Sequence, residues 1–76
     1  MPMDRYQEMT VYCAVVEEHG FASAARRLGL SAPAVTRAVA ALEERIGARL
    51  LIRGARSIRL TESGQQFHED CRRILA

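Results

Sequence analysis

The chain has 76 residues and a formal net charge of +2, which suits one small domain that buries only about 60% of its unfolded surface. Apolar residues make up 49% of the chain but aromatic residues only 5%, so alanine, leucine, valine and isoleucine must fill the core. No apolar run approaches the ~20 residues of a membrane span and no signal peptide opens the chain, so we expect a soluble, cytoplasmic protein.

A first helix is predicted from Asp4 to Glu18. The charge of Asp4 suits the positive end of the helix dipole, and His19 with Gly20 ends the helix. Apolar residues fall on two faces, with Tyr6, Met9, Cys13 and Val16 on one and Val11, Tyr12, Ala14 and Val15 on the other. One face should pack on the next two helices, and the other on the last helix or on a second subunit.

Two helices joined by a tight turn are predicted within residues 21–46. The first begins near Ala22 or Ser23, and Gly29 ends it, because glycine readily adopts the left-handed conformation that closes helices. Ala25 lies where the two helices cross, and a larger side chain there would push them apart. A close crossing with a short connection is the helix-turn-helix arrangement.

The second of these helices has the features of a helix that lies in a DNA groove. Ser31 is a good N-cap, Pro33 sits in the first turn where its missing N–H costs little, and Gly47 supplies the stop. Four apolar residues at helical spacing predict a buried stripe: Val35, Ala38, Val39 and Leu42. Thr36 and Arg37 lie off this stripe, so we expect both to be exposed.

Two short β-prone runs, Arg49–Arg53 and Ser57–Leu60, flank a glycine-containing turn and predict a small hairpin, or wing. Because the runs are short, an irregular extended loop is the alternative. Thr61 caps a final helix whose stripe contains Gly64, Phe67, His68, Cys71, Ile74 and Leu75. The stripe continues to Ala76 without a stop signal, so we expect the natural protein to be longer.

The positive charge is concentrated in the middle of the chain. Residues 26–59 hold eight arginines and two glutamates, a net charge of +6, whereas residues 1–25 carry −3 and residues 60–76 carry −1. Every basic residue is an arginine, which suits bidentate contacts with guanine and phosphate, although codon bias in a GC-rich genome is an alternative reason. The clustering predicts that residues 26–59 face phosphates.

These elements resemble the DNA-binding domain of the LysR-type transcriptional regulators over essentially the whole chain. The similar segments are AVVEEHGFASAARRLGLS (14–31), APAVTRAVAALEERIGARLLIR (32–53) and RSIRLTESG (56–64). The resemblance implies an all-α fold with a minor β-wing: a winged helix-turn-helix in residues 1–60, then the start of a linker helix in residues 61–76 that pairs two subunits. A separate effector-binding domain follows in full-length members, so a small-molecule effector would act through that domain.

The resemblance also implies which residues contact DNA. The base-reading positions are Ala32, Pro33, Thr36 and Arg37, the minor-groove arginine is Arg56, and the backbone contacts are Arg53 and Ser31. Three positions depart from the family pattern. Ala32 replaces a polar base reader and offers only a methyl to thymine, Ala22 replaces a Ser or Thr cap, and Leu51 replaces a frequent phenylalanine.

Other residues suggest chemistry only weakly. Cys13 and Cys71 lie on apolar stripes in a chain without secretory signals, so we expect buried free thiols rather than a disulfide. His68 and Cys71 supply two zinc ligands, too few for a closed site unless a dimer brings a second pair. Glu43 and Glu44 are interpreted as a solvated helix face. With no phosphate loop and no nucleophile paired with a base, we predict no enzyme, cofactor or metal site.

The sequence therefore predicts specific binding of double-stranded DNA by a dimeric bacterial transcriptional regulator. The recognition helix, residues 31–46, would enter the major groove and the wing, residues 53–59, the minor groove. The last helix and the spare face of the first would form the homodimer, which would meet an inverted repeat with half-sites ~34 Å apart. The alternative is a winged-helix module that binds protein without reading DNA, and the salt dependence of binding separates the two.

Overall fold

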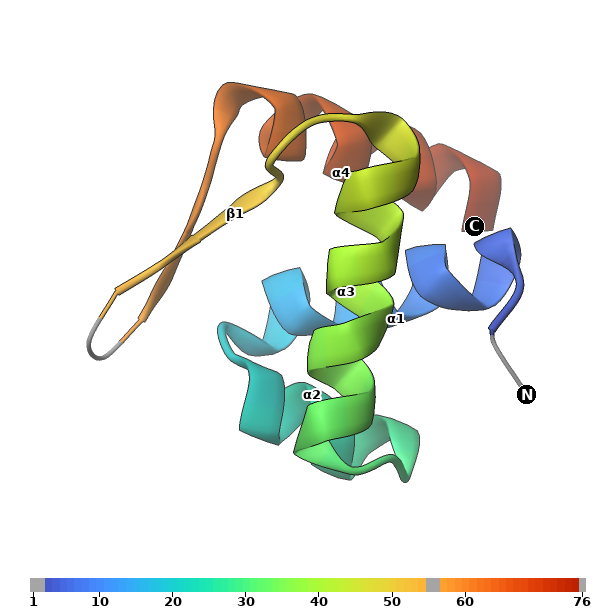
Figure 1. The fold of residues 1–76 in the computed structure, drawn as a ribbon, viewed down its shortest axis with the longest axis vertical. Helices are drawn as coiled ribbons and strands as arrows, with labels where there is room; N and C mark the ends of the chain where they lie inside the picture. Colours follow the sequence, from blue (N-terminus) through green and yellow to red (C-terminus); the bar gives the residue numbers. More distant parts are fainter. Residues whose placement is uncertain (1–2, 55–56, 76) are drawn as a thin grey trace.

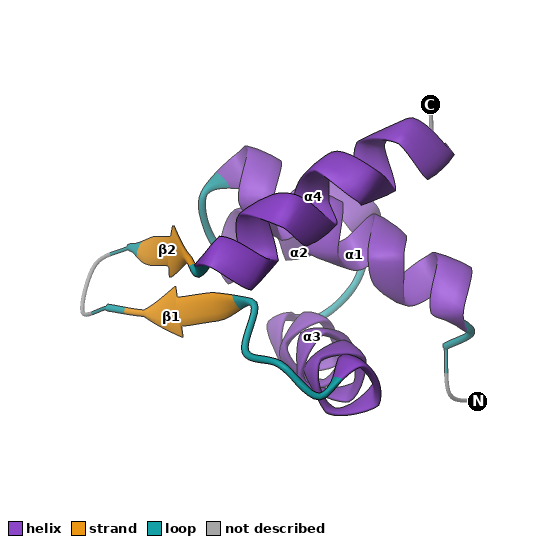
Figure 2. Cartoon of the chain, turned by 90° about the horizontal axis from the view of Figure 1, so that it is seen from above, coloured by secondary structure: helices purple, strands orange, loops and turns teal. Residues whose placement is uncertain are grey.

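The computed structural model describes residues 3–54 and 57–75, so the prediction for Arg56 lies outside the described residues. Four helices and one hairpin follow in the order α1 (Arg5–Glu18), α2 (Phe21–Leu28), α3 (Ala32–Ile46), β1 (Leu51–Arg53), β2 (Ile58–Leu60) and α4 (Glu62–Leu75). Figure 1 shows the hairpin projecting from one side of the helices, and Figure 2 shows α3 and α4 on opposite sides of the molecule. The predicted fold class, all-α with a minor β-wing, is confirmed.

Side-chain caps mark the starts of α1 and α3. Asp4 Oδ1 accepts the N–H of Gln7 at 2.8 Å and Gln7 Oε1 accepts the N–H of Asp4 at 3.0 Å, which forms a capping box. Ser31 Oγ accepts the N–H of Ala34 at 3.2 Å, and Pro33 lies in the first turn of α3. The predicted start near Asp4 and the predicted cap Ser31 are therefore confirmed.

The start of α2 differs from the prediction. The helix begins at Phe21, with Gly20 at the N-cap position, rather than at Ala22 or Ser23. Phe21 is half-buried and packs against the core, so the chain turns into the helix as soon as α1 has ended. Ser23 lies inside the helix and does not cap it; its hydroxyl accepts a hydrogen bond from the Arg26 guanidinium at 3.1 Å.

Residues in the left-handed conformation end the first three helices. His19 ends α1 with φ 59°, while Gly29 and Gly47 end α2 and α3 with φ 70° and 78°. After Gly29, the N–H of Leu30 donates to the carbonyl of Ala25 at 2.9 Å. This bond keeps the connection between α2 and α3 short, and all three predicted helix ends are confirmed.

α1 lies at the centre of the core and packs against α2, α3 and α4, as its two apolar faces predict. The larger core cluster combines α1 with α2, α3 and the start of the hairpin; its α1 members are Val11, Tyr12, Ala14 and Val15. A smaller cluster of Met9, Cys13 and Cys71 joins α1 to α4. The core therefore holds the helix-turn-helix on one side of α1 and α4 on the other.

Two residues assigned to apolar stripes are instead exposed, Tyr6 by 57% and Ile74 by 61%. Leu75 packs against the Met9–Cys13–Cys71 cluster. Because neighbouring residues of a helix point in directions about 100° apart, Ile74 then faces outward. Tyr6 and Leu75 line a groove between α1 and α4.

Within residues 3–54 and 57–75, no helix combines the length and the apolar character that crossing a membrane requires.

The contact between α4 and α1 requires a glycine at position 64. The Tyr12 hydroxyl donates to the carbonyl of Gly64 at 2.9 Å, and a Cβ on Gly64 would lie 2.0 Å from the carbonyl oxygen of Leu50. Burial raises the pKa of Tyr12, so its hydroxyl keeps the proton that it donates. The hydroxyl of Thr61 accepts the N–H of Gly64 at 2.9 Å, which confirms Thr61 as the cap of α4.

β1 and β2 form an antiparallel pair in the register Leu51↔Leu60, Ile52↔Arg59 and Arg53↔Ile58. The N–H of Gly54 donates to the carbonyl of Ser57 at 2.7 Å beyond the last pair. Leu51 is buried, whereas Ile52 is 50% exposed, so one face of the hairpin covers the core and the other faces outward. The predicted hairpin is confirmed, and the alternative of an irregular loop is wrong for these strands.

Candidate nucleic-acid interface

α3 has one buried and one exposed stripe. The predicted buried stripe of Val35, Ala38, Val39 and Leu42 is confirmed. We define the exposed stripe as Pro33, Arg37, Ala40, Ala41 and Glu44. Arg37 is exposed as predicted, but Thr36 is half-buried, so the prediction that both are exposed is wrong for Thr36.

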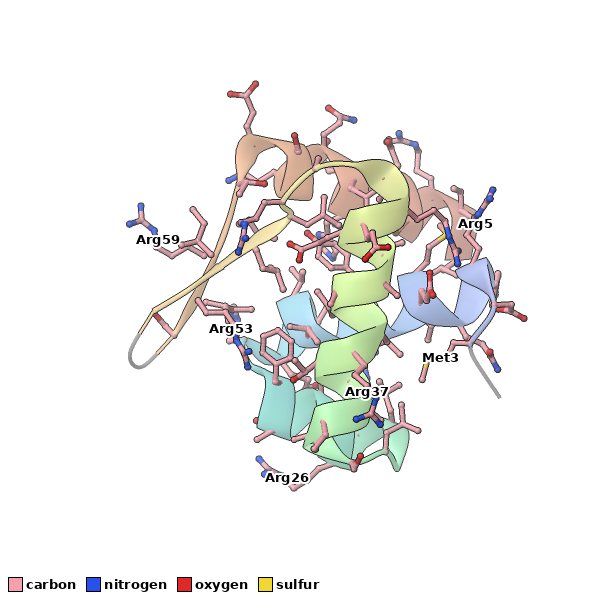
Figure 3. All side chains as sticks on the ribbon, viewed as in Figure 1. Met3, Arg5, Arg26, Arg37, Arg53 and Arg59 are labelled. Carbon is pink, nitrogen blue, oxygen red and sulfur yellow. The ribbon has the colours of Figure 1, made fainter. Side chains whose placement is uncertain are left out.

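Exposed arginines project from α3 and from the elements that precede and follow it. Figure 3 shows Arg26 projecting from α2, Arg37 from α3, and Arg53 and Arg59 from the hairpin. These four side chains and Arg49 are exposed. Among the described residues, none of the five forms an ion pair with an acidic side chain. Their charge is therefore available to an anionic ligand.

Two further arginines, Arg27 and Arg45, form ion pairs that join helices of the fold. Arg27 Nη1 lies 2.8 Å from Glu17 Oε1 and 3.4 Å from Glu18 Oε2, which ties α2 to the end of α1. Arg45 Nη1 lies 2.9 Å from Glu8 Oε1, and the Glu8 residue is only 3% exposed. Sequence reasoning missed this pair, whose only signal is an acidic residue beside the apolar positions of α1. The local excess of positive charge thus comes from the unpaired arginines.

Arg53 is held in place by an aromatic ring. Its guanidinium carbon lies 4.1 Å from the centroid of the Phe21 ring, a cation–π contact between the hairpin and the first residue of α2. The planar guanidinium stacks through its face and keeps its N–H groups directed outward at the edge. Arg53 is therefore held beside the start of α2.

Glu43 does not belong to a solvated helix face, so that prediction is wrong. Its Oε2 accepts the N–H of Leu50 at 2.7 Å and the N–H of Leu51 at 3.2 Å. The chain turns back after α3, which brings these two donors to the carboxylate of Glu43. Glu44, the next residue, is exposed as predicted. Glu43 thus joins the last turns of α3 to the base of the hairpin.

The sequence matches the family of bacterial regulatory helix-turn-helix proteins known as the lysR family over residues 6–65. This chain belongs to the LysR family. The match includes α1, the helix-turn-helix, the hairpin and the start of α4, so the elements that place the arginines around α3 all lie within it.

Named relatives agree with this assignment. The transcriptional activator AaeR of Escherichia coli K12 is 41% identical over 73 residues, which are 96% of this chain and 24% of AaeR. The transcriptional regulator TfdT of Cupriavidus pinatubonensis is 43% identical over 70 residues, 92% of this chain and 31% of TfdT. This LysR-family chain thus spans about a quarter to a third of these relatives. Both are named as regulators, in agreement with the prediction that the chain is not an enzyme.

Solved structures of LysR-family domains share the fold. The CbnR_DBD–DNA complex has a TM-score of 0.90 and 44% identity, with 96% of this chain and 83% of that chain covered. The BenM_DBD complex with catB site 1 DNA has a TM-score of 0.90 and 34% identity, with coverage of 96% and 80%. Both similar structures contain DNA.

The structure describes six of the seven predicted DNA-contact residues of this LysR-family domain. Ser31, Ala32, Pro33, Thr36 and Arg37 lie at the first two turns of α3, and Arg53 lies at the end of β1. The hydroxyl of Ser31 is used in the helix cap, and Arg56 lies outside the described residues. Their contacts with DNA remain a prediction.

The thiols and the histidine lie away from this interface, at the contact of α1 with α4. Cys13 and Cys71 are free and buried, as predicted. Burial raises the pKa of both thiols, that of Cys71 to about 12, so both stay protonated at neutral pH. His68 Nε2 lies 3.9 Å from Glu17 Oε2. In the part of the chain that the structure describes, no three His, Cys, Asp or Glu side chains are grouped to hold a metal ion.

Proposed function

We propose that this LysR-family domain binds double-stranded DNA with sequence specificity, as the DNA-binding part of a transcriptional regulator in the cytoplasm. The observation that carries the proposal is the set of exposed arginines around the exposed stripe of α3. Such an arrangement supplies positive charge for phosphates and an exposed helix that fits the major groove. In this proposal, residues 1–60 are the winged helix-turn-helix and residues 61–76 begin the linker helix.

In the proposed complex, α3 enters the major groove with its first turns facing the base edges. Arg37 donates to a guanine or a phosphate, and Ala32, Pro33 and Thr36 contact neighbouring bases. Ser31 lies against the DNA backbone. Arg53 contacts it too, which its stacking on Phe21 supports because the guanidinium is already positioned. The wing, residues 53–59, lies at the minor groove, where Arg56 is the proposed groove contact.

The proposed assembly is a homodimer formed through α4 and the free end of α1. Three observations support this surface. Figure 2 shows α4 on the side opposite α3, so pairing there leaves α3 free. Tyr6 and Ile74 are exposed, and a groove lies between α1 and α4. Two α3 helices in a symmetric dimer would meet an inverted repeat with half-sites ~34 Å apart. A small-molecule effector would act through another domain.

The experiment that tests the proposed function is selection of random duplex DNA by the purified domain, with the enriched pool sequenced. We expect an inverted repeat with two half-sites about one helical turn apart. Binding should weaken with a slope of about −0.9 in log K against log salt for each phosphate contacted. Retention without enrichment of any sequence would contradict specific reading. Absence of salt-dependent retention would favour the protein-binding alternative.

A further inference from the structure

The exposed stripe of α3 is unusually apolar for a surface helix. Pro33, Ala40 and Ala41 are exposed on it, and Ala32 is exposed beside it at the first helical position. The exposed positions of α4 give the internal comparison, because all of them except Ile74 carry polar side chains. The exposed apolar residues of α3 are therefore not a general property of helices in this chain, and exposed apolar side chains that share one helix face are a candidate contact site.

Arg37 lies in the middle of this apolar surface. Pro33, Arg37 and Ala40 follow one another at steps of four and three, so they share one face of the helix. Within the first three turns of α3, all of which the structure describes, Arg37 and Thr36 are the only side chains that can donate a hydrogen bond. Thr36 is half-buried on the flank. A ligand that meets the stripe thus finds one strong donor with alkyl groups on either side.

Base edges in the major groove offer matching chemistry. Guanine presents the two acceptors that arginine binds as a bidentate pair, and the methyl of thymine is the apolar group on a base edge. We propose that Ala40, together with Ala32, reads thymine methyl groups, so that the half-site places thymines on both sides of a guanine bound by Arg37. This inference rests on the proposed function and extends base reading to Ala40.

The helix geometry sets the spacing of these bases. Ala32 and Ala40 are eight residues apart, which is about 12 Å along the helix axis. In a helix that follows the groove, this length spans three to four base pairs at about 3.4 Å each. Along the helix axis Arg37 lies between the two alanines, so the inference places the guanine between the two thymines.

The test is the random-duplex selection carried out in parallel with two libraries, one containing thymine and one containing uracil, which lacks only the methyl. We expect thymine to be enriched on both sides of a guanine in the first library. In the second library, preference at each of these positions should fall about threefold to fourfold, as expected for one buried methyl. Equal preference for thymine and uracil at these positions would overturn the inference.

A substitution at Ala40 tests whether this residue causes the preference for thymine over uracil. Ala40→Gln replaces the methyl with an amide and keeps a good helix former, so it should lose the preference for thymine over uracil at one position and keep it at the other. Ser63→Gln adds the same side chain at an exposed position of α4 that does not line the groove between α1 and α4, so it should keep both preferences. If Ala40→Gln lost neither preference, Ala40 would not be the reader. The uracil library uses the unmodified chain, so it remains decisive if the variant fails to fold.

The outcomes separate this inference from the proposed function. Enrichment of a defined sequence without a methyl effect would overturn the inference and leave specific DNA binding intact. Absence of any enriched sequence would overturn both.

Discussion

α1 and α3 are nearly equal in length but differ in how they are covered. α1 packs against three helices and buries seven of its 14 residues, whereas α3 buries four of its 15. Tyr12 of α1 is fully buried, while Arg37 of α3 projects outward. The helix that organises the fold is thus not the helix that we propose meets the ligand. Substitutions on α1 contacts should change stability, and substitutions on the exposed stripe should change binding.

The largest expected effect is at the close contact of α4 with Leu50, at the base of the hairpin. Gly64→Ala would place a Cβ 2.0 Å from the carbonyl oxygen of Leu50, which belongs to a backbone that cannot move aside without disturbing the hairpin. We expect a loss of about 3 kcal/mol or more in the free energy of unfolding, the upper end of overpacking costs. Urea unfolding followed by circular dichroism measures it.

Gly20→Ala is the matched control. No atom lies within 4 Å of a Cβ built there, and its φ of 173° is extended backbone that alanine adopts. The expected loss is below about 1 kcal/mol, since only the N-cap preference changes. If Gly64→Ala unfolded at the same urea concentration as the parent, the close contact between α4 and the hairpin base would be refuted.

The next effect concerns the ion pair between α1 and α3. Arg45→Met would leave the buried carboxylate of Glu8 without its partner, and we expect a loss of about 2–3 kcal/mol of stability. The double variant Glu8→Gln/Arg45→Met should recover part of this loss, because no buried charge then remains unpaired. A double-mutant cycle in urea measures the coupling. Strictly additive losses would show that the two side chains do not interact.

A smaller effect is expected on DNA affinity rather than stability. Arg37→Ala should weaken binding to the selected site by about 1–3 kcal/mol and leave urea unfolding unchanged, since Arg37 is exposed and forms no ion pair with a described residue. Titration of labelled duplex measures the affinity. Arg37→Lys is the control, because it keeps the positive charge but not the bidentate guanidinium. Full affinity in Arg37→Lys would indicate that only the charge matters.

The smallest effect concerns the two thiols between α1 and α4. Burial raises the pKa of Cys71 from 9.0 to about 12 and raises that of Cys13 as well. The unfolded chain therefore loses thiol protons at a lower pH than the folded chain. The contribution of the buried thiols to the free energy of unfolding is complete below about pH 9 and declines toward pH 12. Unfolding in urea at pH 8 and pH 10 should show the decline, and Cys71→Ala should reduce it. An equal decline in both proteins would assign it to other groups.

Local features of the fold were predictable because they depend on neighbouring residues. Ser31 caps α3 through a donor three residues away, and Gly29 and Gly47 end helices through their own backbone conformation. The exposure of Arg37 follows from the phase of one helix. The buried stripe of α3 follows from the same phase.

Contacts between residues that are distant in the sequence were not predictable from local patterns. The role of Glu43 depends on the return of the chain after α3, and the pair of Glu8 with Arg45 joins residues 37 apart. Thr36 lies off the buried stripe of α3, yet it is half-buried in the folded chain. The stacking of Arg53 on Phe21 depends on how the hairpin lies over α2. The elements of the candidate site were thus predictable, but the contacts that fix their relative positions were not.

Glu43 links the end of α3 to the start of the hairpin. Its carboxylate accepts the N–H groups of Leu50 and Leu51, so two hydrogen bonds join the last turns of α3 to the base of the hairpin. On the proposed DNA, the number of base pairs between the bases met by α3 and the step met by the hairpin is then constant. An inserted base pair would displace that step by about 3.4 Å and by roughly a tenth of a turn. We therefore expect the proposed half-site to require a fixed number of base pairs between these two contacts.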